Sequence, residues 1–314
     1  MEVLQRPAVV MDPKERWLAH FEGEESKNRH RRALERFETI VGVKATDLLE
    51  RARKCIPEGK PPEELEDALT NYHSHLIAQG QAPTSAAQWY SLIRGFFSAN
   101  HIRLGRTPRE ITASGAAYES SRVLTQKQVR RMIASRRKLR DKLVITFLAQ
   151  TGQRLGVITA MKYGMIRKVD GRGLVEVPPT LLNPHGENVN KAEVRYKFVI
   201  GRNAMRLIEK VADKKGWVLD LSERQIGRIV DQAASNVGIQ EPIETKLKRS
   251  WHFVHPHVFR KYWKHQMKLG GVKDPDLLNS MMGHKLAYAG AYDVFLDEDL
   301  LKAYKRAERK LQVL

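Results

Sequence analysis

Residues 251–292 read WHFVHPHVFRKYWKHQMKLGGVKDPDLLNSMMGHKLAYAGAY, and they combine helix-like apolar spacing with histidines and basic side chains. Between Thr245 and Gly270 the chain has seven Lys or Arg and neither Asp nor Glu. A run of cationic side chains without acidic neighbours is typical of a surface that meets a polyanion. We therefore expect this stretch to hold an anion-binding surface.

The first half of the stretch predicts a helix. Pro256 suits the first helical position, because its missing N–H needs no partner there, and Gly270 suits the end of the segment. On such a helix His257 and Arg260 lie three residues apart and therefore share one face. Two side chains that can both be positive repel each other unless an anion lies between them, and a phosphate fits. An ordinary surface pair is the alternative when this spacing is taken alone.

The second half predicts another helix followed by a turn. Asp274 and Pro275 form an N-cap and a first helical position, and the helix runs into the sequence MMGH. Gly283 can adopt the left-handed conformation that ends a helix. His284 therefore follows directly after the turn.

Composition points to two domains and an anionic partner. The chain has 314 residues, which is long for one domain, and its hydrophobic content of 42% allows packed cores. The net charge of +19 favours a nucleic acid or an anionic surface, although a merely basic protein is the alternative. The single cysteine, Cys55, excludes an internal disulfide. The start lacks a signal-like pattern and no long apolar run occurs, which predicts a soluble protein of a reducing compartment.

Residues 1–104 predict a small helical domain, because helix caps and apolar spacings of three and four recur there. Residues 105–121 are rich in Pro, Gly, Ser and Thr and predict a linker. The helices expected in the first domain follow Asp12 and Pro13 and then span about 25–41, 45–55, 62–79 and 84–101.

Residues 122–314 predict a second domain that is helical around one small antiparallel sheet. Its segment 122–142 has nine basic residues against one acid and suits either a solvated or a phosphate-contacting face. A mostly buried helix then breaks at Gly152, and the next helix starts near Arg154. The C-terminal tail from Asp293 has helical spacing that suits docking on its own domain or on a neighbouring protomer. Strands are expected near 165–169, 174–177 and 193–200, and helices near 203–214 and 222–236.

Two further side chains suit phosphate chemistry. Arg154 opens a helix in an apolar neighbourhood, where an uncompensated guanidinium is costly, so we expect it to meet a partner. Lys191 lies in the polar segment NPHGENVNK between the second and third expected strands. An ordinary solvated lysine is the alternative there.

Together these features resemble the catalytic domain of the tyrosine recombinases, the phage-integrase family, over about residues 124–314. The order of Arg, hairpin Lys, HxxR, GH and Tyr is much more specific than any one part. The preceding helical region looks like the core-binding domain of that family. The resemblance implies a set of catalytic residues, namely Arg154, Lys191, His257, Arg260, His284 and the nucleophile Tyr292.

The chain departs from the family pattern at several positions. Val157 stands where the family usually has an acidic residue, three positions after the first Arg. The tyrosine often lies nine residues after the GH histidine, whereas Tyr292 lies eight after it. Tyr288 is the competing nucleophile, but one helical turn from the histidine is too short to reach the phosphate. Because the hairpin loop is enlarged, Lys197 in the third strand is the second choice after Lys191.

The residue types suit attack on a phosphodiester. Two arginine forks can hold the scissile phosphate, and His284 can donate another hydrogen bond to it. A free tyrosine has a pKa of about 10, so Tyr292 needs the cationic surround and a base, for which His257 is the candidate. Lys191 would protonate the departing 5′ oxygen. The resemblance implies a 3′-phosphotyrosyl intermediate that a 5′ hydroxyl reseals.

Competing chemistries lack their residues. No GxxxxGK[ST] loop is present to hold a nucleotide. The histidines at 252, 255 and 257 have no acidic or cysteine ligand beside them, and this part of the chain is short of the acids that two-metal nucleases need. We therefore expect neither a cofactor nor a metal.

The sequence thus predicts site-specific cleavage and rejoining of double-stranded DNA in integration, excision or transposition. The resemblance implies a homo-oligomer, as a tetramer, assembled on paired DNA sites, without a membrane. It also implies a cytoplasmic, DNA-associated protein of a prokaryotic, viral or mobile-element context. The alternatives are an inactive sequence-specific DNA-binding protein on the same scaffold and a type IB topoisomerase.

Overall fold

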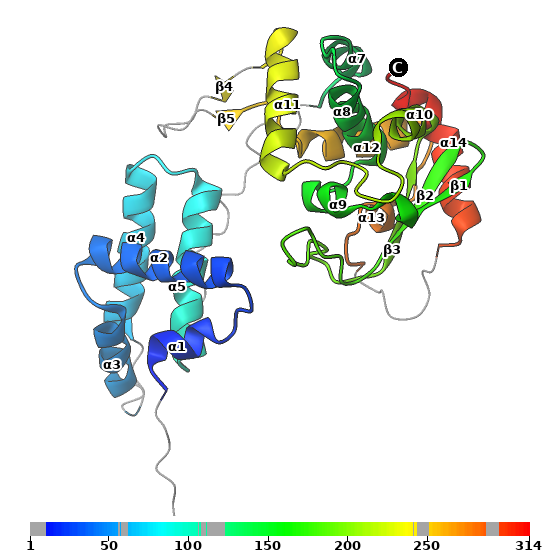
Figure 1. The fold of residues 1–314 in the computed structure, drawn as a ribbon. Coiled ribbons are helices and arrows are strands. Elements are labelled where there is room, and N and C mark those ends of the chain that lie inside the picture. Colours follow the sequence, from blue (N-terminus) through cyan, green and yellow to red (C-terminus); the bar gives the residue numbers. More distant parts are fainter. Residues whose placement is uncertain are drawn as a thin grey trace, which may run out of the picture. The chain divides into compact units, whose positions relative to one another are not determined.

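The described residues form two compact units (Figure 1). The first contains helices α1 to α5, and the second contains all later elements. The protein is represented by a computed structural model that describes residues 11–55, 57, 62–105, 107, 111, 123–240, 242–243, 251–286 and 295–314.

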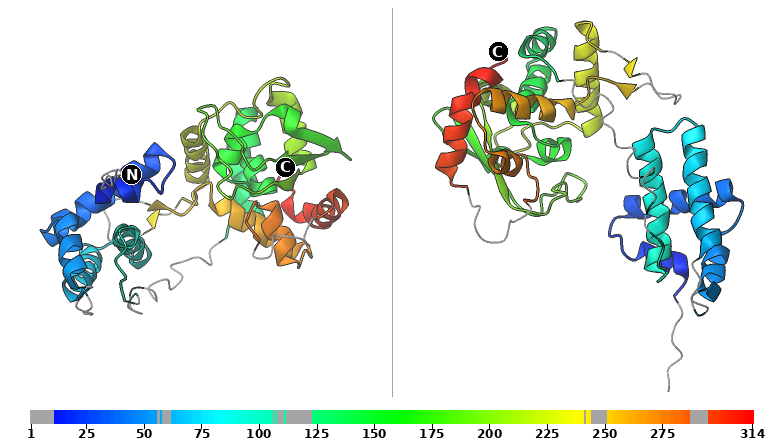
Figure 2. Two further views of the ribbon diagram at one scale, coloured as in Figure 1. Left: turned by 90° about the horizontal axis from the view of Figure 1, so that it is seen from below. Right: turned by 180° about the vertical axis from the view of Figure 1, so that it is seen from behind.

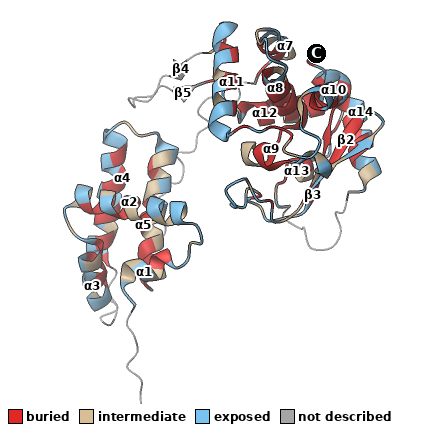
Figure 3. Ribbon diagram, in the orientation of Figure 1, coloured by how far each residue is buried: buried red, intermediate tan, exposed pale blue. Residues whose placement is uncertain are grey.

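The described part of the first unit is built of helices, as the sequence predicts. Asp12 caps the first helix through its side chain, and Gly42 ends the second with a φ of 77°. Each helix is two-faced, with its buried residues on one side (Figure 3). The helices are α1 (Pro13–Leu18), α2 (Glu24–Val41), α3 (Ala45–Cys55), α4 (Glu63–Ala78) and α5 (Pro83–Ala99).

The second unit is mainly helical with a small antiparallel sheet, which confirms the predicted fold class. Its sheet has the order β1-β2-β3, with β1 (Ile166–Val169), β2 (Arg172–Val177) and β3 (Tyr196–Ile200). A 3₁₀ turn at Tyr163–Met165 precedes β1. The helices are α7 (Gln126–Ala134), α8 (Leu139–Thr151), α9 (Leu155–Ala160), α10 (Arg202–Val211), α11 (Glu223–Asn236), α12 (Val258–Leu269), α13 (Pro275–Met281) and α14 (Asp297–Leu311).

Helix α8 is the centre of the second unit, and every residue from Leu143 to Thr151 is buried (Figure 3). A helix that is apolar on all sides must be surrounded by other elements. Accordingly α8 contacts α7, α10, α11, α12 and β3. The mostly buried helix predicted before Gly152 is thereby confirmed.

Three local expectations differ from the structure. The third strand begins at Tyr196 rather than 193, because the Asn190 amide donates to the carbonyls of Pro178 and Val194 and holds the approach to the strand as a turn. Helix α12 begins at Val258, so placing Pro256 at its first position was wrong by two residues. Residues 255–260 form i→i+3 hydrogen bonds first. The short ladder of β4 (Pro242–Ile243) and β5 (Trp251–His252) was not predicted.

The C-terminal helix α14 packs on its own unit, which answers a question that the sequence left open. It packs against α12 and also contacts β3 (Figure 2). The Tyr304 hydroxyl donates to the Gln150 carbonyl oxygen at 2.9 Å. The buried Arg172 guanidinium of β2 forms an ion pair with Glu308, whose other oxygen accepts from the Arg202 N–H. Helix α14 is thus joined to the sheet by a desolvated charge pair.

No helix in the described part of the chain is long and apolar enough to cross a membrane.

Replacing Glu308 by Ala should destabilise the protein strongly. The substitution leaves the Arg172 charge buried without its partner, and breaking such a pair costs about 3–5 kcal/mol. Urea-induced unfolding of the full chain measures the loss. The matched control is Glu209→Ala, which removes only the exposed partner of Lys168 and should change little. Equal losses in the two variants would contradict the importance of burial.

Candidate active site

The candidate site forms where three chain segments meet: the end of α8, the start of α12 and the end of α13. Gly152 ends α8 with a φ of 60°, and a Cβ atom there would lie 2.9 Å from the side chain of Trp263. Only glycine suits both constraints. The turn makes Arg154 the N-cap of α9. The sequence TGQR therefore directs this arginine toward the other two segments.

Arg260 joins the three segments. Its side chain is only 3% exposed. One nitrogen, Nη1, donates to the Gly152 carbonyl oxygen at 2.7 Å, and Nη2 donates to the Met282 carbonyl oxygen at 3.1 Å. Nη2 also lies 3.0 Å from Nε2 of His284. Because an arginine N–H can only donate, Nε2 of this histidine accepts, and the ring proton lies on Nδ1.

Arg154 is half-buried beside the same turn. Its Nη1 donates to the Gly283 carbonyl oxygen at 2.8 Å. Val157, which stands where the family usually has an acid, is 1% exposed and belongs to the hydrophobic core. The carbonyl of Gly283 therefore orients Arg154 in place of a carboxylate on α9.

The described residues make the site cationic. Within the part of the chain that the structure describes, no carboxylate oxygen lies within 4.0 Å of Arg154 or Arg260. Burial and then the charge of Arg154 lower the pKa of Arg260 to about 10. Burial, and then Arg260 and Arg154, also lower the pKa of His284. A buried guanidinium without a carboxylate is costly, so the arrangement favours an anionic ligand.

His257 lies at the N-cap of α12, next to this cluster. Much of its side chain is accessible, and its ring is parallel to that of His255, with the centroids 6.3 Å apart. Partial burial, and then the charges of Arg260 and Lys261, lower its pKa. The Arg260 backbone N–H donates to the His257 carbonyl at 3.1 Å, but among the described residues no hydrogen bond joins the two side chains.

Lys191 lies in a loop that reaches the start of α9. It is exposed and belongs to the turn that the N–H of Glu193 closes on the Asn190 carbonyl. This turn follows the loop tip, which the Asn183 N–H closes on the Glu187 carbonyl. Two residues earlier, Val189 would lie 2.9 Å from a Cβ atom placed on Gly156. The loop thus contacts α9 close to Arg154.

Lys197, the second choice, is bound elsewhere. Its ammonium group lies 2.8 Å from Asp297 and 3.7 Å from Glu176. The bond to Asp297 raises its pKa. These partners hold Lys197 at the junction of β3 and α14.

The predicted nucleophile Tyr292 and its competitor Tyr288 lie outside the described residues. The structure therefore brings together Arg154, Arg260 and His284, with His257 at the adjoining N-cap. Sequence reasoning missed the buried pair of Gln153 and Tyr196 beneath the turn. The only sequence signal was the polar Gln153 between Gly152 and Arg154, and nothing in the sequence indicated Tyr196.

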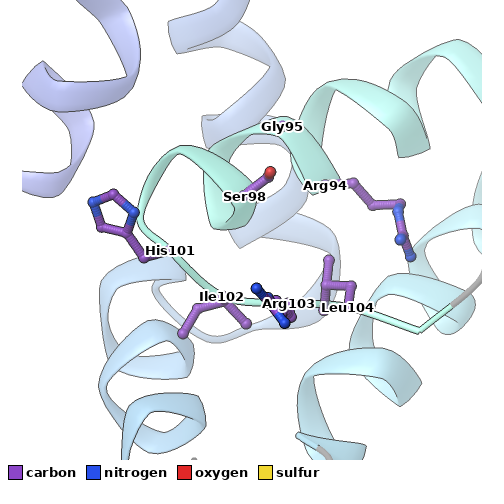
Figure 4. Close-up of a pocket in the computed structure, with 7 residues that line it drawn as sticks. All are labelled: Arg94, Gly95, Ser98, His101, Ile102, Arg103 and Leu104. Atoms are coloured by element: carbon purple, nitrogen blue, oxygen red, sulfur yellow. The ribbon is translucent and has the colours of Figure 1, made fainter.

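The first unit carries its own basic surface. An open hollow of about 820 Å³ at the end of α5 is lined by two arginines, a histidine and a serine (Figure 4). Arg94 donates to the Gly105 carbonyl at 2.7 Å, so its position is held by the backbone. Such a surface suits phosphate groups. The lining residues are Arg94, Gly95, Ser98, His101, Ile102, Arg103 and Leu104.

Among the described residues, no group of three or more His, Cys, Asp or Glu side chains is placed to hold a metal ion.

Replacing Arg154 by Ala should raise the pKa of both His257 and His284 in the free protein. The Arg154 charge disfavours protonation of each ring, so its removal moves both pKa values toward the ordinary value of an imidazole. NMR titration of the histidine rings measures the change. Lys305→Ala, which removes an equal charge that pairs with Asp170, should leave both titrations unchanged. A downward shift in the first variant would contradict the electrostatic account.

Comparisons with known proteins identify the family and the fold. The family model described as the phage integrase family matches residues 122–288. The chain is similar to a lambda integrase tetramer bound to a Holliday junction, with a TM-score of 0.52, 15% identity and coverage of 90% of this chain and 79% of that chain. It is also similar to a lambda integrase dimer bound to a COC' core site, with a TM-score of 0.51, 15% identity and coverage of 91% and 98%.

A third similar structure is the Tn1549 transposon integrase in complex with transposon right end DNA, with a TM-score of 0.50, 12% identity and coverage of 95% and 100%. At these identities the likeness shows the fold. A search of the curated proteins found no match. Because the family match spans more than half of the chain, the chain belongs to the phage integrase family, the tyrosine recombinases.

Proposed function

We propose that this recombinase cleaves and rejoins double-stranded DNA at specific sites through a 3′-phosphotyrosyl intermediate on Tyr292. The observation that carries the proposal is the convergence of Arg154 and Arg260 where no described carboxylate neutralises them. A scissile phosphate supplies the missing negative charge. Such a reaction would serve integration, excision or transposition.

The arginines and His284 suit stabilisation of the transition state. When the tyrosine oxygen attacks, negative charge grows on the nonbridging phosphate oxygens, and donors placed in advance stabilise it. Arg154 uses one nitrogen for the Gly283 carbonyl, which leaves other N–H groups for a phosphate. Backbone carbonyls thus orient the guanidinium groups without neutralising them.

His257 is the proposed base. Its lowered pKa keeps the ring neutral at pH 7, and a neutral imidazole can accept the tyrosine proton. In this step the bond from the Tyr292 oxygen to phosphorus forms and the bond from phosphorus to the 5′ oxygen breaks. The tyrosine proton passes to His257. The reverse attack by a 5′ hydroxyl restores the phosphodiester, so no external energy source is needed.

Lys191 is the proposed acid for the departing 5′ oxygen. Its loop contacts the start of α9, whereas Lys197 is held by Asp297 and Glu176. An exposed lysine on a loop next to Arg154 can turn toward a bound strand. A lysine held by two acids would first have to lose both partners.

Duplex DNA is the proposed partner of both units. The basic hollow on the first unit and the arginine cluster on the second each suit phosphates, and the net charge of +19 favours this polyanion. The similar lambda integrase structures hold a dimer on a core site and a tetramer on a Holliday junction. We propose that this chain likewise assembles as a homo-oligomer on paired DNA sites.

Tyr292→Phe should abolish covalent trapping of DNA. The substrate is a nicked duplex that carries the recognition sequence. Cleavage releases a short strand with a 5′ hydroxyl, which diffuses away and cannot reseal the DNA. The wild-type protein therefore stays covalently attached, without metal or ATP. Gel electrophoresis under denaturing conditions measures the adduct. Tyr288→Phe is the matched control and should trap like the wild type.

Trapping by Tyr292→Phe at the wild-type level would refute the assignment of the nucleophile. A wild-type protein that binds the duplex without forming the adduct would favour the inactive DNA-binding alternative. Relaxation of supercoils without strand exchange would favour a type IB topoisomerase.

Lys191→Ala should slow cleavage by about 10²–10⁴-fold, which is the usual contribution of a general acid. A substrate with sulfur in place of the bridging 5′ oxygen should restore the rate, because a thiolate leaves without a proton. Single-turnover cleavage of the two substrates measures the rescue. Lys197→Ala is the matched control. If the sulfur-containing substrate rescued Lys197→Ala but not Lys191→Ala, Lys197 would be the general acid instead of Lys191.

A further inference from the structure

The turn that follows α13 is held by three successive backbone carbonyls. Met281 accepts from Gln153 Nε2 at 2.8 Å, Met282 accepts from Arg260, and Gly283 accepts from Arg154. Two of these donors are catalytic residues of the proposed function. Gln153 has no place in that chemistry, yet it contacts the same turn.

Gln153 is itself held by Tyr196. The Tyr196 hydroxyl on β3 donates to Gln153 Oε1 at 2.9 Å, and Gln153 Nε2 also donates to the Thr151 carbonyl at 3.2 Å. Both side chains are buried, with 1% exposed for Gln153 and 5% for Tyr196. Both the amide oxygen and the amide nitrogen of Gln153 therefore have hydrogen-bond partners. Such a network keeps one geometry, because each lost bond leaves a buried polar group unpaired.

The Tyr196 ring also forms the floor beneath the turn. Gly283 has a φ of 66°, and a Cβ atom placed on it would lie 2.6 Å from the Tyr196 ring. The backbone of the turn therefore rests directly on this ring. His284 is the next residue, and its N–H donates to the Asn279 carbonyl at 3.0 Å. A shift of the Tyr196 ring would therefore displace Gly283, which directly precedes His284.

We propose that Tyr196 and Gln153 are positioning residues that hold the 281–283 turn and thereby place His284 beside the two arginines. The proposal rests on the function proposed above and deepens it. Neither residue contacts the phosphate. Tyr196 supplies the floor and a hydroxyl, and Gln153 transmits that hydrogen bond to the first carbonyl of the turn.

The alternative of Tyr196 as a second nucleophile does not fit its surroundings. Its oxygen is engaged with Gln153 and its ring is covered by Gly283. Burial raises the pKa of Tyr196 to about 12, although the charges of Arg154 and Arg260 lower it. The hydroxyl therefore keeps its proton and acts as a donor.

The test uses substitutions that remove single groups from the full chain. Tyr196→Phe removes only the hydroxyl, and Gln153→Met removes both polar ends at similar volume. The matched control is Tyr262→Phe, because the Tyr262 hydroxyl is buried in the same unit without a hydrogen-bond partner among the described residues. Circular dichroism and thermal unfolding show that each variant is folded. If Tyr196→Phe fails to fold, Gln153→Met serves for both measurements.

The first measurement needs no DNA. NMR titration follows the His284 ring, which His284→Ala identifies. In the wild type, burial and then the charges of Arg260, Arg154, Lys264 and His257 lower the pKa of this ring, and Arg260 contacts it directly. If the turn is released, His284 becomes more exposed and leaves these charges, so its pKa rises toward the ordinary value. Tyr196→Phe and Gln153→Met should show this rise, and Tyr262→Phe should not.

The second measurement is single-turnover formation of the covalent DNA adduct. Tyr196→Phe should slow it by about tenfold or more, because small misplacements of catalytic groups are costly, while DNA affinity stays within about twofold. The double variant of Tyr196 and Gln153 should be no slower than Gln153→Met, since residues that act as one unit are not additive. In a His284→Ala background, Tyr196→Phe should lose most of its effect.

The outcomes separate the two proposals. A wild-type His284 titration in both variants overturns the inference, and so does a shifted titration with a wild-type rate of adduct formation. If the wild type forms no adduct, the strand-transfer function fails. The DNA-free titration then decides by itself whether Tyr196 and Gln153 place His284.

Discussion

The buried guanidinium of Arg260 is the interaction on which the second unit depends. It bonds to the carbonyl of Gly152, the carbonyl of Met282 and the ring of His284, and so joins α8, α12 and α13 at one point. Removing such a charge from water is costly, and two carbonyl dipoles and a neutral imidazole return only part of that cost. An anion that binds beside Arg260 would offset the rest of this cost, so the unit favours binding of an anion there.

The same constraint sets the chemistry of the neighbouring groups. Burial, and then the clustered cationic charges, lower the pKa of His257 and His284, which favours neutral rings at pH 7. A neutral His257 can accept a proton, and a neutral His284 can accept from Arg260 and donate through its other nitrogen. Described acidic side chains of this unit pair with other cations instead, as Glu308 does with Arg172 and Asp297 with Lys197.

Much of the fold followed from local patterns. The buried helix before Gly152, the capped helix after Asp274 and the turn at Gly283 are all predicted by spacing, caps and glycine chemistry, and all are confirmed. The misplaced starts of α12 and β3 have local causes that spacing does not reveal. Residues around Pro256 form i→i+3 bonds before the helix, and Asn190 diverts its loop into a turn. The roles of the six candidate catalytic residues remain predictions.

The sequence by itself determined the type of protein and the order of its chemical groups along the chain. Side-chain period, helix caps and the spacing of Arg, HxxR and GH are properties of neighbouring residues, so they are legible without a structure. Only the tertiary structure decided that α14 packs on its own unit and that Tyr196 lies beneath Gly283. It also showed that Gln153 connects Tyr196 to the Met281 carbonyl. These contacts join residues tens to more than a hundred positions apart, and no local pattern encodes which distant partner a buried polar group will meet.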